Sequence, residues 1–160
     1  MKKIFLTAIA ACTFLAANAQ DIVFGSFENL IEKKKGVVEY NYAQAKINRS
    51  SLSIDEVIEN NEWKRWRPQQ EKWCKGSLND DLAGIMEFDD YKNPDFILTL
   101  IIQYIDKDFD NPICDAVFTE TNGDVLLKIN GIATSDLNDT GHALAKMIRK
   151  NFKSIRSKKK

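Results

Sequence analysis

The sequence has a single histidine, only three cysteines and three prolines in 160 residues, and no excess of either charge. One histidine excludes most zinc sites and most Ser-His-Asp triads. With 23 basic and 23 acidic side chains, the chain also lacks the surplus of Lys and Arg by which proteins neutralise nucleic-acid phosphates. No apolar run reaches the roughly 20 residues that a membrane-spanning helix needs. What remains is the composition of a globular domain.

The first 19 residues have the three parts of a secretory signal peptide. Two lysines follow the initial Met, Ile4 to Leu15 is apolar, and Ala17-Asn18-Ala19 provides a cleavage site of small residues. We therefore expect a signal peptide over 1–19 and one exported domain over 20–160, in the periplasm or outside the cell. The alternative is a lipoprotein anchored at Cys12, which would leave a shorter apolar segment than signal peptides normally have.

Charge is distributed unevenly along the mature chain. Residues 20–75 contain 10 basic and 9 acidic side chains, residues 76–124 contain 2 and 12, and residues 125–160 contain 9 and 2. Mixed charge of this kind keeps small domains soluble. An acidic centre and a basic carboxy-terminal region can also orient a partner, or allow two copies to associate through their acidic and basic surfaces.

Hydrophobic periodicity and turn signals predict four helices and four strands. The helices are expected at 26–36, from Ser53 onward with a capping box to Glu56, at 78–88, and from about 136 to the end. The strands are expected at 37–47, 95–105, 113–121 and 124–133, the last two joined by a hairpin at Asn122-Gly123.

Strand 95–105 is apolar on both faces, which is typical of a central strand covered on both sides. In the hairpin, we expect Phe118 opposite Leu127, Ala116 opposite Ile129, and Cys114 opposite Gly131. The last three strands then form an antiparallel meander, while the first can run parallel to the second after its helical crossover. The predicted fold is α+β, an α/β sandwich in which helices pack on a four-stranded mixed sheet.

The segment from Val37 to Ile47, with Ser53 to Val57 and Glu62-Trp63 after it, resembles an uncharacterised family of small secreted proteins from Bacteroidota-type bacteria. The family pairs a signal peptide with a strand, a helix ending near a Trp, a late hairpin and a carboxy-terminal helix. Its glycine-rich late loop is replaced here by Thr134 to Asp139. More distantly, the strand pair with its helix is similar to α/β domains of envelope lipoproteins and to amino-terminal domains of TolB-like proteins. Neither resemblance brings a catalytic residue, so both imply a protein that is not an enzyme.

All three tryptophans, Trp63, Trp66 and Trp73, fall within eleven residues that also contain Arg65 and Arg67. Aromatic faces beside cations can stack on sugars or bind a small ligand. The same tryptophans can instead cover the core, because Trp is buried on average.

Cys74 and Cys114 are the only cysteines of the mature chain. In an oxidising compartment they can form a disulfide, worth roughly 4 kcal/mol for a loop of about 40 residues. Two separate buried thiols are the alternative, because free cysteine is among the most buried residue types.

Alternating carboxylates at Asp106, Asp108 and Asp110 are typical of a calcium loop. The match is incomplete, because Asn111 replaces the usual glycine and Val117 replaces the bidentate glutamate. A polar hairpin loop therefore explains this segment better than a metal site, and no cofactor is expected.

The final predicted helix contains five basic residues that are expected to form a basic surface, Lys146, Arg149, Lys150, Lys153 and Arg156. Cations near a helix carboxy terminus stabilise the helix dipole. They can also bind an anionic surface such as lipid. The lone His142 on the same helix has no neighbouring motif that would make it a catalytic base.

The sequence thus favours a non-catalytic secreted or periplasmic protein that interacts with another protein or an envelope component. A carbohydrate or small-ligand binding module built on Trp63, Trp66 and Trp73 is the alternative function.

Overall fold

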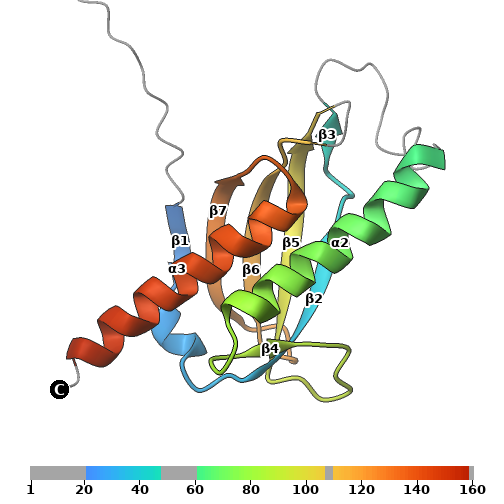
Figure 1. The fold of residues 1–160 in the computed structure, drawn as a ribbon. Helices are drawn as coiled ribbons and strands as arrows, with labels where there is room; N and C mark the ends of the chain where they lie inside the picture. Colours follow the sequence, from blue (N-terminus) through green and yellow to red (C-terminus); the bar gives the residue numbers. More distant parts are fainter. Residues whose placement is uncertain (1–20, 48–60, 107–109, 159–160) are drawn as a thin grey trace, which may run out of the picture.

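The computed structural model describes residues 21–47, 61–106 and 110–158 as an α+β fold, a mixed sheet with two long helices (Figure 1). The strands lie in the order β1-β7-β6-β5-β2-β4, and β3 also pairs with β5. The elements are β1 (Asp21–Gly25), the 3-10 turn η1 (Phe27–Leu30), β2 (Lys35–Asn41), β3 (Lys46–Ile47), α2 (Asn61–Asp81), β4 (Glu87–Phe88), β5 (Phe96–Ile105), β6 (Ile113–Thr119), β7 (Val125–Ala133) and α3 (Leu137–Lys158).

The sheet has seven strands where the sequence predicted four. A turn closed by a 2.9 Å hydrogen bond from the Ala45 N–H to the Tyr42 carbonyl splits the predicted strand 37–47 into β2 and β3. The other two additions, β1 with five residues and β4 with two, are too short for a clear alternation of apolar and polar residues. Their pairing is decided by neighbouring strands: β1 lies antiparallel to β7, and β4 lies parallel to β2.

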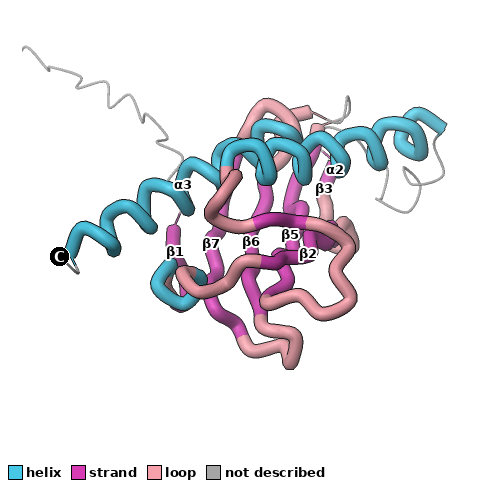
Figure 2. Tube along the Cα trace, turned by 60° about the horizontal axis from the view of Figure 1, so that its bottom comes forward, coloured by secondary structure: helices cyan, strands magenta, loops and turns pink. Residues whose placement is uncertain are grey.

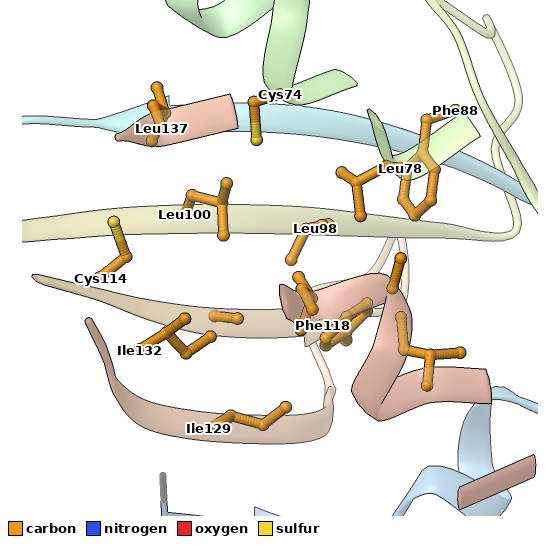
Figure 3. Close-up of a cluster of buried hydrophobic side chains, with 14 of the residues drawn as sticks. Cys74, Leu78, Phe88, Leu98, Leu100, Cys114, Phe118, Ile129, Ile132 and Leu137 are labelled. Atoms are coloured by element: carbon orange, nitrogen blue, oxygen red, sulfur yellow. The ribbon is translucent and has the colours of Figure 1, made fainter. Parts of the chain in front are cut away.

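The strongest predicted strand, β5, is central, with β2 parallel on one side and β6 antiparallel on the other. Phe96, Leu98, Leu100 and Ile102 on one face of β5 are fully buried, and Figure 3 shows Leu98 and Leu100 below Cys74 and Leu78 of α2. The expectation that both faces are covered is wrong for the described residues. Both α2 and α3 lie on one face of the sheet (Figure 2), and the alternate β5 side chains are partly exposed on the other face.

The hairpin register is as predicted at two of three positions. Phe118 lies opposite Leu127 and Ala116 opposite Ile129, but Cys114 lies opposite Ile132 rather than Gly131. A bulge between Cys114 and Ala116 shifts the pairing by one residue. Gly131 adopts a φ of +70°, which favours glycine, and its N–H donates to the Asp115 carboxylate at 3.1 Å.

Helix α2 differs most from the prediction. The segment 63–75, discussed above only for its tryptophans, forms most of this 21-residue helix, and the predicted helix 78–88 contributes only its first four residues. Trp63, Gln70, Cys74 and Ser77 are buried at helical spacing, while Pro68 inside the helix is exposed. Packing of this mixed face on the sheet outweighs its polar composition. The predicted capping box at Ser53 lies outside the described residues.

The other helical predictions agree with the structure in position. The short helix predicted at 26–36 is reduced to η1, whose cap Ser26 accepts a hydrogen bond from the Glu28 N–H. Helix α3 begins one residue after its predicted start and buries Leu137, Leu144, Ile148 and Phe152 against the sheet. Its carboxy-terminal end extends beyond the edge strand β1 (Figure 1).

Candidate functional site

Four cations follow one side of α3. Lys146, Arg149, Lys153 and Arg156 are exposed and are separated by three, four and three residues, the spacing that keeps side chains on one side of a helix. They extend over about 15 Å of the helix axis. We call these four residues the cationic row.

The row borders two shallow depressions that share Arg149. One depression is lined by Asp81, His142, Ala143, Lys146 and Arg149. The other is lined by Ile85, Arg149, Phe152, Lys153, Arg156 and Ser157. We call the two together the cationic groove, since all four cations of the row line it. Lys150, the fifth predicted cation, is exposed but lines neither depression.

No residue of the row forms an ion pair with another described residue. The ion pairs in the described ranges lie elsewhere, for example between Lys33 and Glu120 at 2.8 Å and between Lys75 and Asp90 at 3.3 Å. Ile85 and Phe152 add an apolar surface to the second depression. The groove therefore presents four charges that are available to an anionic ligand.

His142 lies at one end of the groove and links α3 to α2. Its Nδ1 is 2.7 Å from Oδ2 of Asp81, and the side chains are 48% and 42% exposed. The hydrogen bond to Asp81 raises the pKa of His142 above its ordinary value. The sequence offered no signal for this pair, because the two residues are 61 positions apart.

The tryptophans do not form one cluster. Trp63 is 1% exposed and packs edge-on against Tyr42, with ring centroids 5.1 Å apart. It also stacks on Trp66 at 5.3 Å, whereas Trp73 is 50% exposed. Trp63 is therefore a core residue, and of the three tryptophans only Trp66 and Trp73 reach the surface where a ligand could bind.

Trp66 and Trp73 lie on one side of α2, about two helical turns apart. Together with Arg65, Gln69 and Gln70 they line a shallow depression. Arg67 is engaged elsewhere: its Nε is 2.8 Å from Oε1 of Glu71, and its guanidinium lies over the Tyr42 ring at 5.1 Å.

Cys74 and Cys114 are free thiols, so of the two predicted alternatives the structure has the buried thiols and not the disulfide. Cys74 from α2 and Cys114 from β6 are both fully buried in the same core (Figure 3). Burial raises the pKa of each thiol to about 12. Both are structural core residues with little thiolate to react.

The segment of alternating carboxylates, predicted as a polar loop, is closed by hydrogen bonds of its own. Oδ1 of Asp106 accepts from the Asp110 N–H at 2.9 Å, and Oδ2 accepts from the Asn111 side chain at 2.8 Å. Asp108 lies outside the described residues. In the part of the chain that the structure describes, no three His, Cys, Asp or Glu side chains gather as a metal site. No described helix is both long and apolar enough to cross a bilayer.

The fold and these sites define the class only: an α+β domain whose two long described helices lie on one face of a mixed sheet. No protein-family profile matches the sequence, and no curated protein matches it. A chain of the dodecamer formed by a point variant of PelC from Paraburkholderia phytofirmans superposes with a TM-score of 0.40 at 12% identity, over 83% of this chain and 96% of that one. Such a likeness carries no statement about activity or partners.

Proposed function

We propose that this chain is an exported, non-catalytic interaction domain that binds an anionic component of the cell envelope through the cationic groove. The observation that carries the proposal is the row of four exposed cations on α3 that have no ion-pair partner among the described residues. The export signal predicted over 1–19 supports an envelope location.

Spacing makes the four charges act together. Neighbouring members of the row are about 4.5–6 Å apart along the helix axis, less than the screening length of about 10 Å at 0.1 M salt. Each Lys or Arg close to an anionic surface contributes about 1 kcal/mol. Binding is therefore expected at low salt and is expected to weaken steeply as salt is added.

A polyanion tests the proposal directly. We expect the mature protein, residues 20–160, to bind heparin as a model polyanion, and to elute at lower salt when Lys153→Glu and Arg156→Glu are combined. Lys150→Glu is the matched control for one charge reversal, since Lys150 is on the same helix but outside the groove. The proposal fails if the wild type does not bind heparin. It also fails if the single reversals Lys150→Glu and Lys153→Glu lower the salt concentration of elution equally.

A second candidate function is glycan binding by Trp66 and Trp73. The observation that favours it is the shared depression in which a half-exposed indole, a second indole and two glutamine side chains meet. Indole faces stack on sugars, and amides can hydrogen-bond to sugar hydroxyls.

Trp73 is the residue to vary for this candidate. We expect a binding glycan to shift the tryptophan emission of the wild type, and we expect Trp73→Ala to remove most of that shift. Lys72→Ala, an exposed neighbour that does not line the depression, is the control. A panel of glycans that leaves the wild-type emission unchanged would remove this candidate.

A further inference from the structure

The face of the sheet away from α2 and α3 is covered by no described element (Figures 1 and 2). Ile97, Thr99 and Ile101 of β5 point to this face, between the buried residues of the same strand, and are partly exposed. Val37 and Val117, paired with Ile97 and Thr99 respectively, belong to the same face. A sheet face rich in Val, Ile and Thr fits a second packed layer.

The sequence of β5 also predicts a second packed layer on this face of the sheet. An apolar side chain at both faces of a strand is typical of strands covered twice, yet the described chain covers β5 once. Val125, 41% exposed, and Phe24, 57% exposed, extend the uncovered apolar surface toward the edge strand β1. Phe24 lies on this face because it is paired with Lys128 in the β1–β7 register.

Two opposite charges lie in one row across this face, Glu39 on β2 and Lys128 on β7. The register places Glu39 of β2 beside Thr99, Thr99 beside Val117, and Val117 beside Lys128 of β7. Glu39 and Lys128 are three strand spacings apart, about 14 Å. Neither makes an ion pair with a described residue, while the buried Asp115 on the same face is satisfied by the Gln103 side chain and the Gly131 N–H.

We propose that two copies of this chain pair face to face through this surface, with Glu39 of each copy opposite Lys128 of the partner subunit. The row is symmetric about the line between β5 and β6, with β2 and β7 equally distant from it. A two-fold axis parallel to that line and midway between the two sheets brings each Glu39 opposite Lys128 of the partner subunit, so the same contact forms twice, as in an isologous dimer.

The separation of two packed sheets allows Glu39 to reach Lys128 of the partner subunit. Packed sheets lie about 10 Å apart, a gap that a glutamate and a lysine side chain together can bridge. The same axis brings Val37 opposite Val125 of the partner subunit and places Thr99 and Val117 at the centre. A second copy is the occupant that the charges select, because it supplies both opposite charges at the required separation.

Sedimentation equilibrium of residues 20–160 with charge reversals tests the pairing. We expect the wild type to dimerise, and we expect Glu39→Lys or Lys128→Glu to weaken the dimer at least about tenfold, since like charges then face each other twice. Combining Glu39→Lys with Lys128→Glu restores opposite charges and is expected to recover wild-type affinity to within about threefold. Val117→Lys, which brings two cations together at the axis, is expected to leave a folded monomer.

Controls keep folding and association apart. Circular dichroism of each variant reports whether the monomer is folded, and Lys150→Glu on the opposite side of the molecule is expected to leave the dimer unchanged. A wild type that stays monomeric up to millimolar concentration overturns the proposal, as does a double reversal that associates no better than the single ones. Because the cationic groove lies on the helical side, the heparin result does not depend on this outcome.

Discussion

Gly141 of α3 lies directly against the main chain of Cys74 in α2. A Cβ atom on residue 141 would be 2.5 Å from the Cys74 carbonyl oxygen and 3.2 Å from Cβ of Ser77. The two helices can approach this closely only because residue 141 has no side chain. The close approach holds Asp81 and His142 within hydrogen-bonding distance and thereby forms one end of the cationic groove.

Gly141→Ala is expected to destabilise the protein by about 1–3 kcal/mol, because the added methyl group meets backbone atoms that cannot turn away. Gly76→Ala is the matched control. Nothing lies within 4 Å of a Cβ at residue 76, so this change is expected to stabilise α2 by about 0.5–1 kcal/mol. Urea denaturation measures both, and equal effects of the two changes would contradict the close contact.

The His142–Asp81 pair predicts a pH-dependent contribution to stability. The pKa of His142 in the folded state is raised above the ordinary 6.5, so the stabilisation is fully present below about pH 6.5 and is lost as the pH rises through the raised value. Since both side chains are nearly half exposed, the contribution is below about 1 kcal/mol.

Unfolding free energies of the wild type and His142→Gln, measured from about pH 5.5 to pH 8.5, test this contribution. The difference between the two proteins is expected to shrink as the pH rises. Asp81→Asn is expected to remove the same pH dependence, and a difference that grows with pH would refute the assignment.

The two thiols are expected to be unreactive in the folded protein. Burial raises the pKa of Cys74 and of Cys114 to about 12, so little thiolate forms near pH 8. Ellman's reagent should therefore detect both thiols only after denaturation, and a reducing agent should not shift the melting temperature. Failure to detect either thiol in denaturant would show that a disulfide forms in solution.

Tryptophan substitutions separate core from surface. Trp63→Ala is expected to cost about 3–5 kcal/mol, because a fully buried ring is removed from the core. Trp73→Ala is expected to cost less than about 1 kcal/mol, because half of that side chain is already in solvent. Thermal denaturation of the two variants compares them, and similar losses of stability would contradict the separate roles.

Much of the fold followed from local pattern. Strand β5 and helix α3 were predictable because apolar residues repeat at the period of each element over ten residues or more. The hairpin was predictable from its Asn122-Gly123 turn between two apolar segments. The basic surface of α3 was likewise predictable from the sequence. Helix α2 was missed, because its buried face mixes Trp63 and Cys74 with polar Gln70 and Ser77, so no apolar stripe marks it.

The sequence by itself determined the alternation of β5, the turn of the hairpin, the amphipathic stripe of α3 and the list of available charges, because each depends on residues close together in the chain. Only the tertiary structure decided which residues distant in the sequence lie close together. It brought Asp81 to His142, set Ile85 beside Arg149, buried Trp63 while leaving Trp73 exposed, and placed Glu39 and Lys128 in one row. Those relationships depend on how helices and strands distant in sequence pack, and close packing is a property of the whole chain rather than of any segment.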